Sequence, residues 1–194
     1  MTNDAGRRAG WDGRHGGRPG GGEPEPFVIE VLPLLPRRGV ALDVAAGRGR
    51  HSLALARAGL SVVAVDYSRK AIAALADAVH GGGAAVWPVV ADLDTFPIGD
   101  GTLDLIVNVN YLDRSLFPKF ARALKPEGFL LADTFLVDQA ASGHPRDPRF
   151  LLGHYELRTL IGGLEIIRYR EGLMVYPDGT SAWRASALVR RKET

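Results

Sequence analysis

The segment from residue 40 to residue 66 constrains the fold of this chain more than any other. Val40–Val44 has the apolar character of a short buried strand, a glycine-containing turn follows, and Arg50–Ala58 has the spacing of a helix that Gly59 ends. A second apolar strand follows at Ser61–Val65. Strand, turn, helix and strand in this order predict a βαβ unit, and hence a parallel sheet with helices packed against it.

Two acidic residues stand at the ends of these strands, Asp43 within the first and Asp66 directly after the second. The carboxyl edge of a parallel sheet is where nucleotide-like ligands bind. Gly47 and Gly49 in the turn allow a ligand to approach the backbone closely, and a carboxylate can accept hydrogen bonds from two ribose hydroxyls. The pattern therefore predicts a nucleotide-like ligand at this edge.

The details of the turn favour one ligand of this kind. A dinucleotide-binding turn has a third glycine where Ser52 stands here, and Asp43 would repel a pyrophosphate. S-adenosylmethionine has no phosphate and carries a sulfonium and an ammonium, both of which Asp43 attracts. The sequence therefore favours S-adenosylmethionine, and a nicotinamide-dependent oxidoreductase is the less favoured alternative.

The sequences DVAAGRG and VVAVDYS resemble the first two motifs of class I S-adenosylmethionine-dependent methyltransferases, and VVADLD at 89–94 resembles the third. The resemblance spans about residues 38–135. It implies a Rossmann-like, seven-stranded, mainly parallel sheet of order 3-2-1-4-5-7-6, with an antiparallel last strand and helices on both faces. It also implies the cofactor-binding residues Asp43, Ala45, Gly47, Gly49, Asp66, Tyr67, Asp92, Leu93 and Asn108.

Individual roles follow from the same resemblance. Asp66 is expected to hold the ribose and Asp92 the exocyclic amine of the adenine, while the backbone N–H of Leu93 meets a ring nitrogen. Ala45 departs from the family pattern, because a glycine is usual at this position. We expect the methyl group of Ala45 to be tolerated if its backbone φ is negative.

Further elements are predicted along the chain from hydrophobic periodicity and turn residues. Pro88 lies in an expected strand and lacks an N–H donor, which places that strand at a sheet edge. The pair Asp178-Gly179 between two extended runs predicts a hairpin, which makes the final strand antiparallel. We expect strands at 84–90, 103–109, 129–135 and 164–170, helices at 27–35 and 154–161, helix caps at Ser68 and Ser115, a turn at 126–128 and a loop at 136–152.

Length and composition indicate one globular domain. The chain has 194 residues and 46% hydrophobic residues, so residues 26–194 are expected to form the methyltransferase domain after a flexible, Gly- and Arg-rich segment at 1–25. Its start lacks the apolar centre of a secretory signal and no apolar run is long enough for a bilayer, which predicts a cytoplasmic protein without a membrane partner.

Charge and residue usage exclude several other functions. The absence of cysteine excludes disulfides, thiolate metal sites and a cysteine nucleophile, and we expect no metal site. The net charge of +2 comes without a dense basic patch, so no nucleic-acid partner is expected. We expect a monomer or a homodimer.

A closer resemblance concerns the methyl acceptor. The Trp11-Asp12-x-Arg14-His15 and Asn110-Tyr111-Leu112 segments, together with HPRDPRFLL, are similar to the small tellurite-resistance and thiopurine-type methyltransferases. This implies a small, polarisable acceptor such as a thiol, a tellurite- or selenite-type oxyanion, or a thiopurine-like compound. The candidate catalytic residues are Tyr111 and His144, and the candidate substrate-binding residues are Trp11, Arg114 and Arg146.

Two other histidines, His51 and His154, are candidate bases. His51 follows the glycine turn and is expected to be a solvent-exposed residue at a helix start, although it could face the cofactor. His154 is expected to be structural. The alternative to an enzyme is a non-catalytic module that binds S-adenosylmethionine for regulation.

Overall fold

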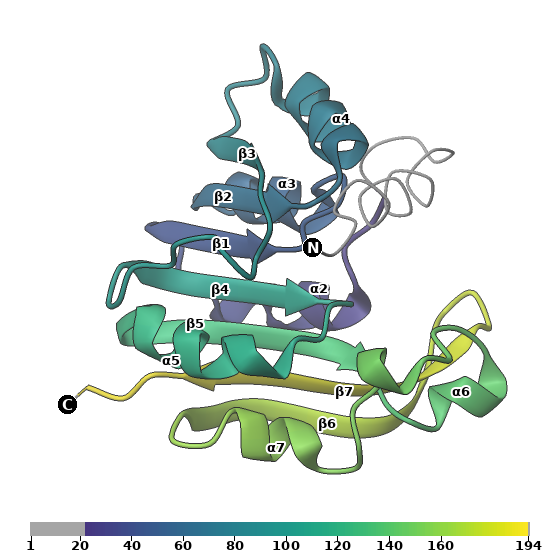
Figure 1. Ribbon diagram of the computed structural model, residues 1–194. Coiled ribbons are helices and arrows are strands. Elements are labelled where there is room, and N and C mark those ends of the chain that lie inside the picture. The colour runs from purple at the N-terminus through teal and green to yellow at the C-terminus, as the bar shows by residue number, and fades with distance from the viewer. Residues whose placement is uncertain (1–21, 194) are drawn as a thin grey trace. The chain divides into compact units, whose positions relative to one another are not determined.

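The computed structural model describes residues 22–193. Its seven strands form one sheet of order β3-β2-β1-β4-β5-β7-β6 (Figure 1). The predicted strand order is therefore confirmed. The described residues divide into two compact units, one of residues 22–25 and 36–97 and the other of residues 26–35 and 98–193. The expected flexible stretch up to residue 21 lies outside the described residues.

The first unit contains three parallel strands and two helices. These are β1 (Val40–Val44), α3 (Arg50–Arg57), β2 (Ser61–Asp66), α4 (Arg69–Val79) and β3 (Val86–Val90). In the ladders, Asp43 lies beside Ala64, and Asp66 lies beside Val90. Because β1 and β2 are parallel, both acids lie at the same edge of this part of the sheet.

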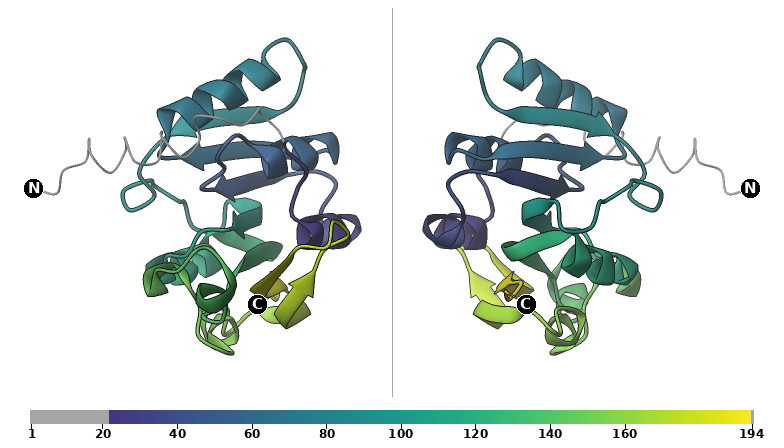
Figure 2. Two further views of the ribbon diagram at one scale, coloured as in Figure 1. Left: turned by 90° about the vertical axis from the view of Figure 1, so that its right-hand side faces the viewer. Right: turned by 90° about the vertical axis from the view of Figure 1, so that its left-hand side faces the viewer.

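Helix α4 begins where the sequence predicts. The Ser68 hydroxyl accepts a hydrogen bond from the Ala71 N–H at 3.2 Å, which satisfies one of the unpaired donors of the first turn. Figure 2 shows α4 running alongside β3, and its buried Ile72 and Leu75 face the strands. Pro88 lies in the edge strand β3, as predicted, where its missing N–H breaks no ladder bond.

The second unit contains the remaining four strands with short helices between them. The helices and 3-10 turns are α2 (Pro26–Val31), η1 (Leu32–Leu34), η2 (Arg114–Leu116), α5 (Phe117–Ala123), α6 (Gln139–Ser142), η3 (Pro148–Phe150) and α7 (Glu156–Leu160). The strands are β4 (Leu103–Val109), β5 (Leu124–Phe135), β6 (Glu165–Val175) and β7 (Ser181–Arg190). Strand β4 pairs with β5 in parallel, and β7 pairs antiparallel with both β5 and β6. The predicted antiparallel last strand is therefore confirmed.

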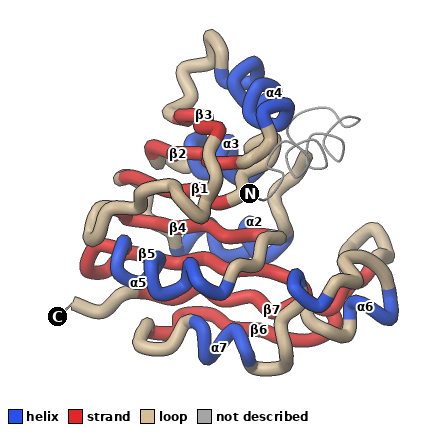
Figure 3. Tube along the Cα trace, in the orientation of Figure 1, coloured by secondary structure: helices blue, strands red, loops and turns tan. Residues whose placement is uncertain are grey.

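Turn chemistry explains the C-terminal hairpin. The Asp178 carboxylate accepts a hydrogen bond from the Thr180 N–H at 2.9 Å, and Gly179 adopts φ +82°, a conformation that favours glycine. Figure 3 shows the connection from β3 to β4 without a helix and the connection from β5 to β6 with α6 and α7, between which η3 also lies. The predicted loop at 136–152 therefore contains two short helical turns.

Several predicted boundaries are wrong. Ser115 does not cap a helix, because the Asp113 carboxylate accepts from the Ser115 N–H at 2.9 Å and α5 begins only at Phe117. The predicted turn at 126–128 lies inside β5, where the pairing with β4 shifts register. The helix predicted at 27–35 ends earlier as a 3-10 turn, the one predicted at 154–161 is shorter, and β6 extends beyond residue 170.

Candidate functional site

Asp66 organises the turn after β1. Its Oδ2 accepts a hydrogen bond from the Gly47 N–H at 2.8 Å, and its Oδ1 accepts one from the Ser68 N–H at 2.7 Å. A carboxylate offers about four lone-pair positions. These two bonds fix the orientation of the carboxylate and leave acceptor positions for two hydroxyls of a ligand.

Asp43 is a buried carboxyl group with an unusual pKa. Its side chain is 1% exposed, and its Oδ2 accepts from the Ser52 hydroxyl at 2.5 Å. Burial, the largest cause, and the negative charge of Asp66 raise the pKa of Asp43 to about 7, although the Ser52 hydrogen bonds and the Arg50 charge act to lower it. Ionised Asp43 is costly in this place unless a positive charge compensates it, so the site favours a cationic ligand.

The turn between β1 and α3 has left-handed residues at Ala45 (φ 52°), Gly47 (φ 56°) and Gly49 (φ 77°). The condition under which we expect the Ala45 methyl group to be tolerated, a negative φ, is therefore not met. The backbone holds Ala45 in this conformation, because the next N–H, that of Ala46, donates to the carbonyl of Val65 in β2 at 2.9 Å. For a residue with a side chain, this conformation costs about 1–2 kcal/mol.

Gly49 is required by packing as well as by the turn. A Cβ atom at this position would lie 2.3 Å from Cδ1 of Leu75 in α4. The sequence motif assigns Gly49 to the approach of a ligand, whereas the structure adds a contact between helices as a second reason.

The third predicted motif follows β3 in the same unit. The Ala91 N–H donates to the carbonyl of Asp66 at 3.0 Å, which places Asp92 near the end of β2. Asp92 Oδ1 accepts from the Asp94 N–H at 3.1 Å, and Leu93 is buried. All predicted cofactor-binding residues except Asn108 therefore lie in the first unit.

The histidine after the turn has a different role from the one expected. His51 is buried, and its Nε2 accepts from the Glu25 N–H at 3.3 Å. The neighbouring Arg50 binds the Glu25 carboxylate at 2.8 Å. The prediction of an exposed His51 is wrong, because Glu23 and Glu25 lie against the start of α3.

In the second unit, polar residues gather at the carboxyl end of β4. Asn108 is buried, and among the described residues its Oδ1 has no hydrogen-bond partner. Asn110 is exposed and has φ 58°, and its N–H donates to the carbonyl of Asp133 at 2.9 Å. Tyr111 follows as a half-buried residue. A buried oxygen without a partner is unusual and often marks a ligand site.

Sequence reasoning missed a buried ion pair beside these residues. Arg184 of β7 donates from Nε to Asp133 Oδ1 at 2.9 Å, and the two side chains are 3% and 2% exposed. Arg184 Nη2 also donates to Asn110 Oδ1 at 2.6 Å, and the Ser186 hydroxyl donates to Asp133 Oδ1 at 3.0 Å. The available signal was an arginine inside the apolar run of the last strand, since a buried charge needs a partner.

The other predicted acceptor residues lie on the segments after β4 and β5. The Arg114 guanidinium binds the Glu156 carboxylate through two bonds of 2.5 and 3.0 Å and donates to the carbonyl of Leu151 at 2.9 Å. His144 and Arg146 are exposed. Trp11 lies outside the described residues.

Comparison with known proteins bears on this arrangement. Residues 41–128 match the family described as a methyltransferase domain. Residues 41–128 are a methyltransferase domain. None of the curated proteins matches the sequence.

Several solved structures resemble most of this chain, beyond the residues that match the family. TehB from Haemophilus influenzae is 20% identical with a TM-score of 0.73, over 86% of this chain and 62% of TehB, so the chain spans less than two thirds of that protein. A SAM-dependent methyltransferase from Methanosarcina mazei is 19% identical with a TM-score of 0.70, over 89% of this chain and all of that one. The [4+2]-cyclase SpnF is 16% identical with a TM-score of 0.69, over 87% and 81%.

The match over residues 41–128 agrees with the predicted class I S-adenosylmethionine-dependent methyltransferase family, and the solved structures show the predicted fold. The donor set of the methyltransferase domain fits this cofactor, because Asp43 favours a cation and Asp66 keeps acceptor positions for a ribose. Within residues 22–193, no set of His, Asp and Glu side chains could hold a metal ion, and no helix has the length and apolar character to cross a membrane.

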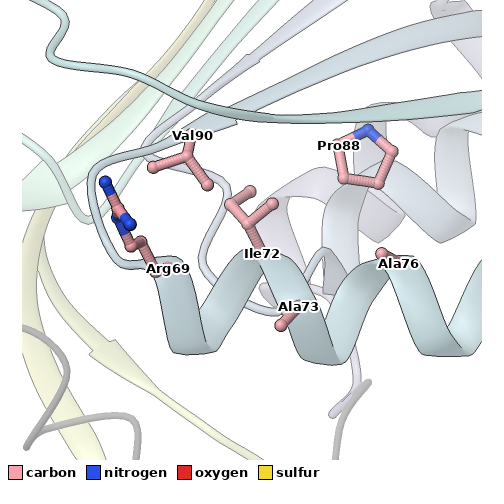
Figure 4. Close-up of a pocket in the computed structure, with 6 residues that line it drawn as sticks. All are labelled: Arg69, Ile72, Ala73, Ala76, Pro88 and Val90. Atoms are coloured by element: carbon pink, nitrogen blue, oxygen red, sulfur yellow. The ribbon is translucent and has the colours of Figure 1, made fainter.

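The methyltransferase domain also has a surface groove of about 450 Å³ between α4 and β3. Figure 4 shows the side chains that line it, which are Arg69, Ile72, Ala73, Ala76, Pro88 and Val90. None of the predicted cofactor-binding residues is among them. Val90 of this groove nevertheless lies beside Asp66 in the ladder of β2 and β3, so the groove adjoins the candidate site.

His154 is a structural contact, as expected. Its Nδ1 lies 3.2 Å from Glu171 Oε1 and its Nε2 lies 3.0 Å from Asp138 Oδ2. It therefore links the segment before α7 to β6 and to the start of α6.

Proposed function

We propose that this protein is a cytoplasmic enzyme that transfers the methyl group of S-adenosylmethionine to a small-molecule acceptor. The observation that carries this proposal is the pair of strand-end carboxylates around the glycine turn. Asp66 is oriented by two backbone N–H groups, and Asp43 is buried in a place that favours a positive charge. Together they suit the two halves of a cationic adenosyl compound.

The roles of the individual residues follow from chemistry. Asp66 would hold the ribose hydroxyls, Asp92 and the Leu93 N–H the adenine, and Asp43 the charged methionine half. Bound S-adenosylmethionine supplies an activated methyl group for in-line displacement, so the chain mainly aligns the reactants and excludes water.

On the acceptor side, we propose that Tyr111 and His144 take part in positioning or deprotonating the acceptor. Arg146 is exposed and suited to an anionic group, whereas Arg114 would have to give up its bond to Glu156. The resemblance to tellurite-resistance and thiopurine-type enzymes supports a small polarisable acceptor, and TehB is a structural neighbour.

Calorimetry with the Asp66→Ala variant tests cofactor binding. We expect the affinity for S-adenosylmethionine to fall by about 1.5–3 kcal/mol, the range for hydrogen bonds to a charged group. Asp77→Ala removes an exposed acid of α4 and serves as the control with unchanged affinity. Unchanged affinity in Asp66→Ala would remove Asp66 from the site.

Methyl transfer is tested with methyl-labelled cofactor and a panel of thiols, tellurite, selenite and thiopurines. We expect label in at least one acceptor. Cofactor binding without transfer to any of them would favour the non-catalytic alternative, and the cyclase among the structural neighbours shows why the fold alone does not decide the reaction.

A further inference from the structure

The groove between α4 and β3 belongs entirely to the first unit and is largely apolar. Its volume of about 450 Å³ lies within the range of small-molecule sites. All of its lining residues except one are apolar, namely Ile72, Ala73, Ala76, Pro88 and Val90. A groove of this size and character can take the hydrocarbon part of a small ligand.

The remaining lining residue, Arg69, is a cation without a counter-charge. Figure 4 shows its side chain extending from the start of α4 toward Val90 at one end of the groove, with Pro88 and Ala76 at the other end. Arg69 is exposed, and within the described part of the chain its guanidinium has no hydrogen-bond or ion-pair partner. A guanidinium binds a carboxylate through its planar fork of N–H donors. One end of the groove therefore suits an anion.

The open edge of β3 is unsuited to a peptide that would add a strand. The Ala91 N–H, directly after β3, donates to the Asp66 carbonyl of β2 at 3.0 Å, so every second N–H before it also faces β2. Pro88 then stands on the open side, where it has no N–H to donate. A peptide paired with this edge would lack a main-chain bond at that point, whereas a small molecule needs none.

We propose that this groove binds a medium-chain carboxylate, whose carboxyl group pairs with Arg69 and whose hydrocarbon chain lies along Ile72 toward Ala76. The helix from residue 69 to residue 76 spans about 10 Å, which suits an extended chain of about eight carbons. This site goes beyond the proposed function, because none of the predicted cofactor-binding residues lines the groove. The carboxylate and the cofactor must therefore be able to bind at the same time.

Calorimetry with octanoate, 1-octanol and octylamine tests the ligand class. The three probes share their hydrocarbon chain and differ in the charge of the polar end. We expect octanoate to bind about three- to fivefold more tightly than 1-octanol, as for an exposed ion pair, and octylamine to bind more weakly than both. Equal affinity for octanoate and octylamine would overturn the inference.

The same titration is repeated with the full chain in the presence of excess S-adenosylhomocysteine. We expect the octanoate affinity to stay within about twofold, because the two ligands have no lining residue in common. Competition between octanoate and S-adenosylhomocysteine would mean that the groove is part of the cofactor site, and would contradict a separate site.

Methyl NMR locates the bound probe. The chain has seven isoleucines, so ¹³C labelling of their δ1 methyl groups gives seven signals, and Ile72→Val assigns that of Ile72. We expect octanoate to shift the Ile72 signal and not that of Ile161, a buried residue of the second unit. Octanoate binding without a shift at Ile72 would place the probe elsewhere and refute the groove as its site.

These spectra also test whether a second copy of the chain covers the groove. In that case the Ile72 signal would move as the protein concentration rises, and octanoate would reverse the change. We expect the signal to be independent of protein concentration, and a dependence would overturn the assignment of the groove to a small molecule.

The Ala76→Leu variant fills the groove from an exposed position of α4. Leucine is nearly as good a helix former as alanine, so the helix should be kept. The matched control is Ala78→Leu, because Ala78 is exposed in the same helix and is not a lining residue. We expect Ala76→Leu to lower the octanoate affinity at least about tenfold through lost burial of the chain, and Ala78→Leu to change it less than about twofold. Similar affinities in the two variants would contradict binding in the groove.

The Arg69→Gln variant tests the charged end. Glutamine keeps N–H donors but carries no charge. We expect the octanoate affinity to fall to that of 1-octanol, while the affinities for 1-octanol and S-adenosylhomocysteine stay unchanged. Lys70→Gln removes the neighbouring exposed cation, which does not line the groove, and serves as the control. If octanoate kept its advantage over 1-octanol in Arg69→Gln, another cation would hold the carboxylate and the proposed role of Arg69 would be wrong.

Discussion

The raised pKa of Asp43 predicts that cofactor affinity depends on pH. Burial raises this pKa to about 7, and only the ionised carboxyl attracts a cationic ligand. About a tenth of the Asp43 side chains are ionised at pH 6 and about three quarters at pH 7.5, so the affinity for S-adenosylmethionine should be about eightfold higher at pH 7.5. Above that pH the amino group of the cofactor begins to titrate, which limits the useful range.

Asp43 also makes the stability of the folded protein depend on pH, and this stability falls as the pH rises, whereas the cofactor affinity rises. The pKa in the folded state is raised above 3.8, so the contribution of Asp43 to stability is fully present below about pH 4 and is lost as the pH rises through 7. A shift of about three pH units corresponds to about 4 kcal/mol. The cofactor should therefore stabilise the protein more at pH 7.5 than at pH 6.

Calorimetry at pH 6, 6.5, 7 and 7.5 measures the affinity, and Asp43→Asn provides the control. The amide keeps an acceptor for the Ser52 hydroxyl but cannot ionise. We expect its affinity to be lower and independent of pH in this range. A flat profile in the unmodified protein, or the same slope in Asp43→Asn, would refute the reasoning, because that slope would then belong to histidines.

Two further predictions concern stability, measured by denaturant unfolding. Gly49→Ala places a Cβ 2.3 Å from Leu75 at φ 77°, whereas the control Gly81→Ala has a similar φ of 75° and meets nothing within 4 Å. Gly49→Ala should therefore lower the free energy of unfolding by about 1–3 kcal/mol more than Gly81→Ala. Equal losses of stability in the two variants would contradict the packing role of Gly49. Arg184→Met should cost about 3–5 kcal/mol because it leaves Asp133 buried without its cation, and adding Asp133→Val should restore part of the loss. A milder effect of the single change would mean that water reaches Asp133.

Local signals explain which parts of the fold could be predicted. The bounds of β1 and β4, the cap of α4 and the Asp178-Gly179 hairpin depend on a few adjacent residues, and each matches the structure. The start of β5 does not match. Pro126, Glu127 and Gly128 have turn chemistry, yet the strand continues on both sides of them because its ladder with β4 resumes after a shift of register.

In the candidate site, too, some residues follow from local sequence and others depend on the pairing of distant strands. The carboxylates of Asp43 and Asp66 stand at the ends of apolar strands, so the sequence alone predicts them. The ion pair of Arg184 and Asp133 joins residues 51 positions apart, and it depends on the β5–β7 register that sets Phe135 opposite Arg184. No short motif encodes that register. The same holds for the orientation of Asn110, which depends on a residue 74 positions away.

The contacts of each residue also decide which variant gives the clearest test of the cofactor site. Asp66→Ala removes the acceptor for two backbone N–H groups, and Gly49→Ala introduces a clash with Leu75, so each changes the turn as well as the ligand contacts. Asp43→Asn preserves the size of the side chain and the acceptor for Ser52. A loss of affinity in Asp43→Asn, together with a lost pH dependence, therefore reports on the charge alone.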